Sequence, residues 1–406
     1  MWKKRMISFV LLISVLLPCV SVYGFAKVKK KEPAEFIYMG DDYKAVMRAK
    51  YGLIAKNVSE VYIGVHPDEW QVYIRQKEKV KEVRLTEKKG GKYEKYTVAA
   101  NCKNIYPQPD GNITVDKNNR VLFTGIYTCG FFVKHTSKKE CDKAYNLKHP
   151  YIDQVVETDV EKSWGNNNMF AYVKNNALYI TGSIMGELVR KTGDGCYKYD
   201  TVQTYFEGRG NQIQQVVCCQ DFASGCNIFV LMQDGSVWGI GRNNRKLISN
   251  SKKKNYPQFV KIIDGGVKQI AACINNVAVV KKNNTLWTWG RTIQSKKKKY
   301  SATPRKIANN VKEVAVSTAG SMPIRSIIVY LKKNHKAYGI GNNYNGEGYA
   351  FTNRYKKGWN SKPVLLMKNV KHVYAATDST LMLTRKNSLY WSGAQSWYLG
   401  CSIIEG

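Results

Sequence analysis

The segment VKKNNTLWTWG (residues 280–290) contains the pattern that decides the fold. An apolar strand ends where this segment begins. The Asn-Asn pair of the segment tolerates the positive φ that a tight turn requires. Leu286, Trp287 and Trp289 then form a second apolar strand that closes on Gly290. The segment therefore predicts a β-hairpin.

The same pattern recurs along the chain, and its closing glycines lie 49 to 59 residues apart. The other copies are VDKNNRVLFTG (115–125), VKNNALYITG (173–182), MQDGSVWGIG (232–241), LKKNHKAYGIG (331–341) and LTRKNSLYWSG (383–393). A VxxV strand precedes most hairpins, and a further strand near a proline or an apolar run follows several. Four antiparallel strands repeated at this period predict the blades of a β-propeller.

Two parts of the N-terminal region fit the repeat less well. A partial copy, FIYMG, ends at Gly40, and the interval from there to Gly125 does not suit one or two ordinary copies. The segment from Trp70 to Lys89 is either a degenerate blade or an insertion.

The clearest copies, Val267 to Gly290 and Val370 to Gly393, resemble the regulator of chromosome condensation repeat family. The resemblance implies an all-β fold, a seven-bladed β-propeller of that type with four-stranded antiparallel blades. It covers residues 37–406, with a degenerate first third and the clearest repeats in 160–400. The last blade lacks its outer strand in sequence order, so we expect the N-terminal strand to complete it and close the ring.

The first residues have the character of a secretory signal peptide (1–24), because Lys3, Lys4 and Arg5 precede a long apolar run. Cleavage after Gly24 or Ala26 suits the small residues there, and an uncleaved anchor is the alternative. A basic linker (25–36) follows. No later run is long enough for a membrane span, so we expect an extracellular or cell-surface protein of the secreted bacterial type.

The charge of the chain predicts an anionic macromolecular partner. It has 64 Lys and Arg against 30 Asp and Glu, a formal net charge of +34. Most of the cations are lysines, which favours diffuse, salt-sensitive attraction over bidentate recognition. We expect a protein or an anionic envelope polymer as partner, and secretion argues against nucleic acid as a partner in vivo.

The cysteines indicate neither a zinc site nor a complete disulfide framework. Nine of the ten lie beyond the signal peptide, an odd number, and their spacing lacks paired CxxC motifs. Two local pairs, Cys129 with Cys141 and Cys219 with Cys226, are the first to test for disulfide bonds.

No motif in the sequence points to catalysis. GIGRNN and GIGNNYNG imitate part of a dinucleotide fingerprint, but they end the repeated third strand and lack the third glycine. The five histidines do not cluster in sequence. We therefore predict a protein that is not an enzyme, with no catalytic residue, no cofactor and no metal.

In a blade of four antiparallel strands, the loops after the first and third strands emerge on one face. We predict that this face binds the partner, because it combines aromatic side chains with cations. Blade packing is the competing interpretation for each tryptophan, and a solvated charge is the competing one for each lysine. The candidate residues are Trp164, Phe222, Arg242, Arg291, Tyr344, Trp397 and Tyr398.

These observations favour a secreted, non-enzymatic propeller that binds a protein or the cell envelope through one face. The resemblance implies an alternative, a regulator that promotes guanine-nucleotide exchange on a small GTPase. A glycan-binding protein is a third possibility, because the chain contains 27 tyrosines.

Overall fold

A computed structural model describes residues 53–65, 70–85, 93–108, 111–125, 134–135, 151–166, 169–182, 199–200, 202–221, 225–295, 299–318, 326–343, 358–376 and 379–393. The chain divides into two units, Met1–Asp41 and Asp42–Gly406, and every described residue belongs to the second. The predicted signal peptide, the linker and the partial repeat ending at Gly40 lie outside the described residues. Within the described part, no helix is long and apolar enough to span a membrane.

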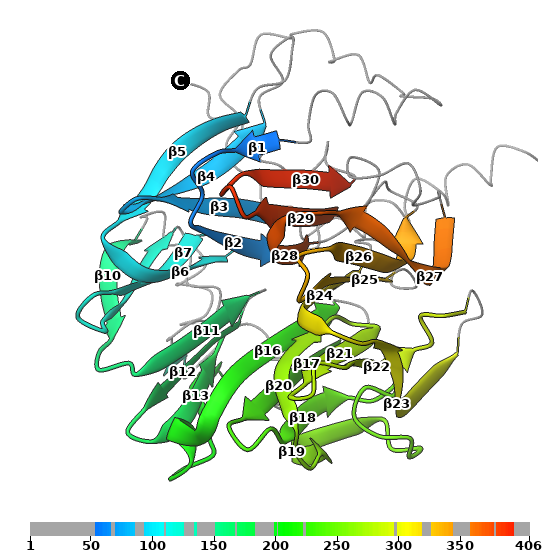
Figure 1. The fold of residues 1–406 in the computed structure, drawn as a ribbon. Helices are drawn as coiled ribbons and strands as arrows, with labels where there is room; N and C mark the ends of the chain where they lie inside the picture. The colour runs from blue at the N-terminus through cyan, green and yellow to red at the C-terminus, as the bar shows by residue number, and fades with distance from the viewer. Residues whose placement is uncertain are drawn as a thin grey trace, which may run out of the picture. The chain divides into compact units, whose positions relative to one another are not determined.

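The second unit is a seven-bladed β-propeller of four-stranded antiparallel blades (Figure 1), which confirms the predicted fold. Blade 1 contains β2 (Glu60–Val65), β3 (Trp70–Gln76), β4 (Lys79–Leu85) and β5 (Tyr93–Ala100). Blade 2 contains β6 (Cys102–Gln108), β7 (Gly111–Asp116), β8 (Val121–Gly125) and β10 (Tyr151–Glu157). Blade 3 contains β11 (Lys162–Asn166), β12 (Met169–Lys174), β13 (Ala177–Thr181) and β15 (Val202–Tyr205).

The second half of the ring is more regular. Blade 4 contains β16 (Ile213–Asp221), β17 (Gly225–Met232), β18 (Val237–Arg242) and β19 (Asn255–Ile263). Blade 5 contains β20 (Val267–Ala272), β21 (Asn276–Lys281), β22 (Leu286–Arg291) and β23 (Tyr300–Ala308). Blade 6 contains β24 (Val311–Thr318), β25 (Ser326–Lys332), β26 (Ala337–Asn343) and β27 (Gly358–Met367). Blade 7 contains β28 (Val370–Ala376), β29 (Ser379–Thr384), β30 (Leu389–Gly393) and β1 (Leu53–Ala55).

Two short pieces lie outside the blades. The strands β9 (Lys134–His135) and β14 (Tyr199–Asp200) pair with each other, and a 3₁₀ turn, η1 (Gly210–Gln212), precedes blade 4. Blade 1 resolves the ambiguity at Trp70 to Lys89, because this segment supplies the two middle strands of a complete blade.

The N-terminal strand closes the ring as predicted. The strand β1 pairs antiparallel with β30, with Leu53 opposite Tyr390 and Ala55 opposite Leu389. Just beyond β1, the Val58 N–H donates to the Asn387 carbonyl at 2.9 Å. Blade 7 is thus assembled from both ends of the propeller sequence, and its outer strand covers an edge that would otherwise be open.

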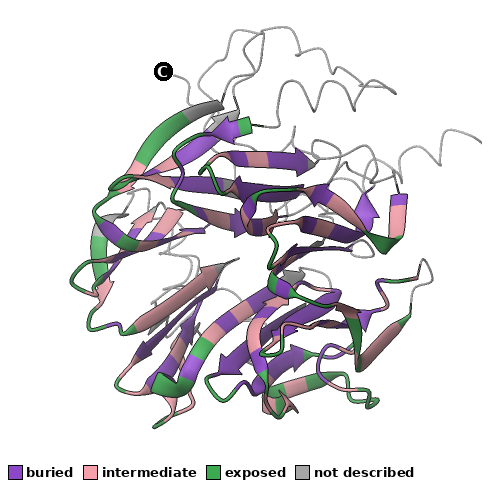
Figure 2. Ribbon diagram, viewed as in Figure 1, coloured by how far each residue is buried: buried purple, intermediate pink, exposed green. Residues whose placement is uncertain are grey.

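The core lies between the blades rather than within them. The buried apolar side chains of the described residues form seven clusters, one at each junction between neighbouring blades, including the junction of blade 7 with blade 1. Second strands such as β21 are almost wholly buried, whereas fourth strands such as β19 are mostly exposed or half-buried (Figure 2). Each blade therefore depends on both neighbours for its stability.

The cysteine pair Cys219 and Cys226 illustrates this arrangement and corrects one expectation. Cys219 packs in the cluster between blades 4 and 5, whereas Cys226 packs in the cluster between blades 3 and 4. The two side chains therefore point to opposite faces of blade 4 and form no disulfide bond. Cys129 and Cys141 lie outside the described residues.

The repeated glycine that closes the third strand has a steric cause. Gly241, Gly290 and Gly341 have φ values of 115°, 92° and 108°. A Cβ atom at Gly241 would lie 2.1 Å from the Cys226 carbonyl oxygen, and one at Gly290 would lie 2.3 Å from the Asn275 carbonyl oxygen. Only glycine fits at the end of the third strand, because a side chain there would collide with the backbone at the start of the second strand.

Most of the hairpin turns are one residue longer than the predicted two-residue type. In five blades the residues before and after a three-residue turn are hydrogen-bonded, as Met232 and Ser236 are at 2.9 Å, and the last turn residue has a positive φ. Among the described hairpins, those of blades 1 and 3 have two-residue turns, Lys77–Glu78 and Asn175–Asn176, and the second has the expected positive φ at both positions. The extra residue forms a bulge that the twisted hairpin accommodates.

Backbone hydrogen bonds join each of these turns to the next blade. The Val267 N–H donates to the Gly235 carbonyl at 3.1 Å, and the Val311 N–H donates to the Asn284 carbonyl at 2.9 Å. The Val370 N–H makes the equivalent bond to the His335 carbonyl at 3.0 Å. The positive-φ residue of each turn thus also positions the first strand of the following blade.

A second set of bonds joins the first strands, which line the axis of the propeller. The Gln269 side chain donates to the Val314 carbonyl at 3.2 Å and accepts from the Val314 N–H at 3.0 Å. Gln215 makes the same two bonds to Ile270, at 2.9 and 3.1 Å. Each glutamine therefore pairs with both the N–H and the carbonyl of one residue of the next blade.

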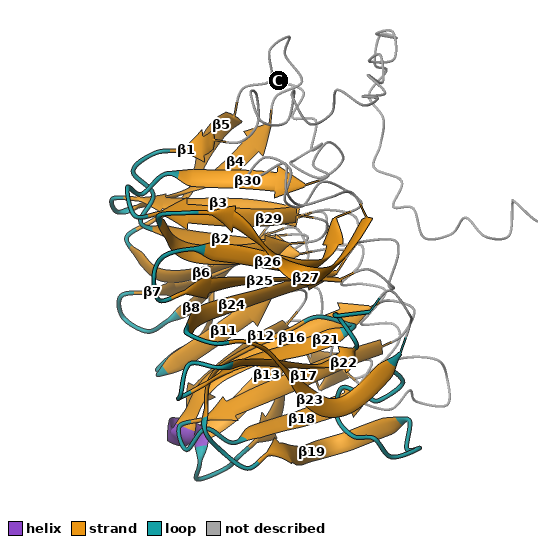
Figure 3. Cartoon of the chain, turned by 45° about the vertical axis from the view of Figure 1, so that its right-hand side comes forward, coloured by secondary structure: helices purple, strands orange, loops and turns teal. Residues whose placement is uncertain are grey.

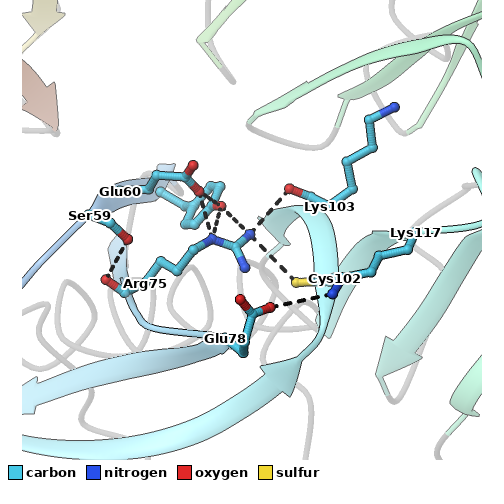
Figure 4. Close-up of polar contacts among 8 residues, drawn as sticks. Ser59, Glu60, Arg75, Glu78, Cys102, Lys103 and Lys117 are labelled. Carbon is cyan, nitrogen blue, oxygen red and sulfur yellow. Dashed lines mark hydrogen bonds and ion pairs between the residues drawn. The ribbon is translucent and has the colours of Figure 1, made fainter.

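The junction of blade 1 with blade 2 uses an arginine instead (Figure 4). Arg75 donates to Glu60 at 2.7 Å, to the Tyr62 hydroxyl at 2.6 Å and to the Lys103 carbonyl at 3.2 Å. Burial raises the pKa of Glu60, but the hydrogen bonds from Tyr62 and Arg75 outweigh it and leave that pKa below its ordinary value. Charge-assisted bonds here replace the neutral amide pair of the regular blades.

Ring closure by β1 predicts different effects for two adjacent residues. Replacing Ile54, which is 4% exposed, with Ala should lower the free energy of unfolding by about 2–4 kcal/mol, because it leaves a cavity between blades 7 and 1. Replacing Leu53, which is 40% exposed, with Ala should change it by less than about 1 kcal/mol. Urea unfolding of both variants measures this difference, and equal effects would contradict closure by β1.

We call the paired bonds from Gln269 to Val314 a glutamine clamp. The clamp predicts that two glutamine substitutions lower the free energy of unfolding by different amounts. Gln269→Met keeps the side-chain length but removes the side-chain partners of the Val314 N–H and the Val314 carbonyl, so it should cost about 1–3 kcal/mol. The control is Gln214→Met, which removes a single exposed bond to the Lys268 carbonyl and should cost under about 0.5 kcal/mol. Chemical denaturation of the two variants tests the clamp, which predicts a clearly larger loss for Gln269.

Candidate functional site

The two faces of the propeller differ in how their loops are built. The short hairpin turns and the linkers between blades lie together on one face (Figure 3), which we call the turn face. The connections after the first and third strands of each blade lie on the other, which we call the loop face. Its best-described parts are residues 243–254, 273–275 and 292–295 in blades 4 and 5.

One buried side chain fixes the long loop 243–254. Asn243 is 1% exposed, and its Oδ1 accepts from the Ile248 N–H at 3.2 Å and the Ser249 N–H at 3.0 Å. Its Nδ2 donates to the carbonyls of Ser249 and Lys253, each at 2.9 Å. These bonds hold the loop in one conformation without secondary structure.

Contacts with blade 5 anchor the same loop from outside. The Trp289 indole N–H donates to the Leu247 carbonyl at 2.7 Å, and Leu247 itself is buried. Asn250 accepts from the Ala302 N–H at 2.7 Å and donates to the Thr303 hydroxyl at 3.0 Å. The loop is therefore a preorganised surface that spans two blades.

This surface is strongly basic. The described loop-face segments 242–254, 273–275, 291–295 and 299 contain no Asp or Glu. Their cations are Arg242, Arg245, Lys246, Lys252, Lys253, Lys254, Arg291 and Lys299.

The tyrosine at the base of the loop is in contact with both the polar side chains and the cations of this surface. Hydrogen bonds with Ser249 and Ser251 lower the pKa of Tyr256, and the ammonium groups of Lys253 and Lys246 lower it further. The Lys253 ammonium lies 4.8 Å from the Tyr256 ring centroid. The contributions of the two lysines are those of a surface with a positive potential.

The structure places the predicted binding residues in different environments. Arg242 is exposed on the loop face. Arg291 follows the equivalent glycine in blade 5 but is only 4% exposed, and its guanidinium lies 4.0 Å from the centroid of the Trp359 ring. Trp164 is half-buried against the cluster between blades 3 and 4. Phe222, Tyr344, Trp397 and Tyr398 lie outside the described residues.

Arg291 belongs to a polar network under the loop face. Its N–H donates to the Asn275 carbonyl at 2.8 Å, and its own carbonyl accepts from Asn276 Nδ2 at 2.6 Å. Asn276 in turn accepts from the Ser326 hydroxyl of blade 6 at 2.8 Å. These residues position the ends of the strands. Of Arg242 and Arg291, which follow equivalent glycines, only Arg242 is therefore exposed.

The described residues contain no cluster of potential metal ligands. No three His, Cys, Asp or Glu side chains among them lie close enough to bind a metal ion. His372 contacts Glu313 at 2.9 Å between blades 6 and 7, and His335 occupies a hairpin turn with φ of 60°. Both histidines therefore have positions explained by the fold.

Comparison with known proteins gives structural but not sequence relatives. No protein-family model and no curated protein sequence matches the chain. Human WBSCR16 superposes with a TM-score of 0.57 and 12% identity, covering 84% of this chain and 87% of that one.

Two structures of a yeast protein resemble this chain about as closely as WBSCR16 does. Yeast RCC1 (Prp20), solved with Kap60 bound, gives a TM-score of 0.56 and 14% identity, covering 92% of this chain and 86% of that one. Prp20p from Saccharomyces cerevisiae, described with its binding to Gsp1p and histones, gives 0.57 and 13%, covering 82% of each chain. At these identities the similarity establishes the fold, a propeller of the regulator of chromosome condensation type, and the fold alone.

Sequence reasoning missed Asn243, the residue that shapes the loop. Its only signal was the position directly after Gly241-Arg242, which blade 6 repeats as Gly341-Asn342-Asn343. Asn343 is also buried, so asparagine at this position is a recurring choice.

The role of Asn243 predicts the behaviour of the loop. Asn243→Ala should increase the rate of tryptic cleavage at Lys252 to Lys254 about tenfold or more under native conditions, because the loop loses at least four hydrogen bonds to one side chain. The exposed neighbour provides the control, since Asn244→Ala should leave the rate within about twofold of the unmodified chain. Similar cleavage of both variants would show that other contacts fix the loop.

Proposed function

We propose that this chain is a non-enzymatic propeller that binds a protein partner through the loop face of blades 4 and 5. The observation that carries the proposal is the loop 243–254, which Asn243 and contacts with blade 5 hold in a single conformation. A preorganised loop loses little conformational entropy on binding, so its contacts contribute more fully to affinity.

The charges of the loop face define the kind of surface that would fit it. Arg242, Lys252 and Lys253 are exposed, and no carboxylate of the described loop segments neutralises them. A folded protein with an acidic patch would be attracted over a distance and then held by contacts with the rigid loop.

Structural relatives support the general idea of a protein partner. Yeast Prp20, which shares this fold, has been solved with Kap60 bound. Guanine-nucleotide exchange, the alternative implied by the sequence resemblance, stays a prediction that nucleotide-release assays with small GTPases would test. Secretion through the N-terminal segment likewise stays a prediction from residues 1–24.

Affinity purification with matched variants tests the proposed face. The bait is the full chain without substitutions, and the loop triple combines Arg242→Glu, Lys252→Glu and Lys253→Glu. The rim triple combines Arg305→Glu, Lys306→Glu and Lys362→Glu, three exposed cations of the fourth strands of blades 5 and 6. Both triples change the net charge equally.

We expect a protein that survives a rising salt wash on the unsubstituted bait and on the rim triple, and that is absent from the loop triple. Retention by the loop triple, or equal loss from both triples, would contradict binding through the loop face. Thermal unfolding of each bait confirms that the variants are folded.

A further inference from the structure

The turn face of blades 5 to 7 presents cations at the same two positions of three consecutive junctions. The outer position is the first residue of each hairpin turn. There the Lys282 N–H donates to the Gly266 carbonyl at 2.8 Å, the Lys333 N–H to Asn310 at 2.9 Å and the Arg385 N–H to Asn369 at 2.9 Å. All three side chains are exposed.

The inner position is the second residue of each first strand, Lys268, Lys312 or Lys371. These ammonium groups contact neutral oxygens: Lys268 reaches Asn284 Oδ1 at 2.6 Å, Lys371 reaches Asn387 Oδ1 at 3.4 Å and Lys312 reaches the Lys371 carbonyl at 3.5 Å. We call the six residues of the two positions the turn-face cation cluster.

None of the ion pairs found among the described residues includes any of the six members of this cluster, and Lys282 reaches the main-chain carbonyl rather than the carboxylate of Asp234, at 3.5 Å. Glu313, the acidic residue next to Lys312, is engaged by the Val373 N–H at 3.0 Å and by His372 at 2.9 Å. Burial lowers the pKa of the Lys268 ammonium, and the charge of Lys333 lowers it further. The cluster therefore holds like charges that repel each other and favour an anionic partner.

We propose that the turn-face cation cluster binds an extended acidic polypeptide segment. Five of its six cations are lysines, which attract carboxylates as flexible point charges without demanding a fixed geometry. Asn284 and Asn387 beside them offer amide groups that can hydrogen-bond to the peptide groups of an extended chain.

The aromatic side chains of these blades argue against stacking of unpaired nucleic-acid bases at this surface. Trp287 and Tyr338 are half-buried, with Lys281 at 4.6 Å and Lys332 at 5.1 Å from their ring centroids. Of the large hydrophobic side chains that are exposed in the described structure, Leu53 lies in β1 of blade 7, Tyr96 in blade 1 and Val155 in blade 2, so none is an aromatic ring of blades 5 to 7. Stacking of unpaired bases would need such exposed rings on this face.

The test uses a fluorescent oligo-glutamate peptide of about ten residues, which spans about 35 Å when extended. Binding to the full chain is measured by fluorescence anisotropy across a salt series. The turn triple combines Lys282→Glu, Lys333→Glu and Arg385→Glu, and the rim triple defined above is the control, with the same change of charge and the same residue types. Thermal unfolding verifies that both are folded.

We expect the unsubstituted chain to bind the peptide at low salt and to release it progressively as salt rises. The turn triple should weaken binding by about tenfold or more and the rim triple by less than about threefold, because close charges dominate over net charge in screened solution. Undetectable binding to the unsubstituted chain, or equal weakening by both triples, would overturn the proposal.

A DNA oligonucleotide of equal charge, single-stranded or duplex, supplies the second arm. Tighter binding of DNA than of the peptide, lost selectively in the turn triple, would assign the cluster to nucleic acid and overturn the acidic polypeptide. Because this experiment uses a defined peptide and the turn face, its outcome is independent of the loop-face partner.

Discussion

Every blade of this protein buries its side chains only against its two neighbours, and the rest of the structure depends on that constraint. The seven apolar clusters of the described residues lie at the seven junctions, so no blade has a core of its own. The turn carbonyls and the glutamine clamps act at the same junctions, where they satisfy backbone groups that the blades would otherwise bury unpaired. Closure of the ring is therefore a condition for burial of the core.

The sequence predicted the fold because the repeated hairpin has steric requirements that few residues meet. Glycine at 241, 290 and 341 is required by positive φ and close carbonyl contacts, so the pattern is visible without structural knowledge. Blade 1 was ambiguous because its hairpin, with a positive φ at Lys77, has neither the asparagine turn nor the closing glycine. The longer turns and the separation of Cys219 from Cys226 depend on bulges and strand register, which local sequence does not reveal.

The candidate site was less predictable, since exposure depends on residues far away in sequence. Arg242 and Arg291 follow equivalent glycines, yet only Arg291 is covered, because Trp359 of the next blade lies over its guanidinium. Trp164 is likewise partly covered by a neighbouring blade, because it packs against the cluster between blades 3 and 4. The lysine run at 252–254 was visible in sequence, but its rigid presentation depends on Asn243, whose hydrogen bonds could not be inferred from composition or period.

The pairing of β1 with β30 also sets an order of events during synthesis. Leu53 is made early but pairs with Tyr390, near the end of the chain, so the most non-local contact of the sheet forms last. Until the two strands pair, each has an open edge, and the cluster between blades 7 and 1 is incomplete. The nascent chain must therefore keep its first strand unpaired while six blades accumulate, a state in which open edges expose it to aggregation.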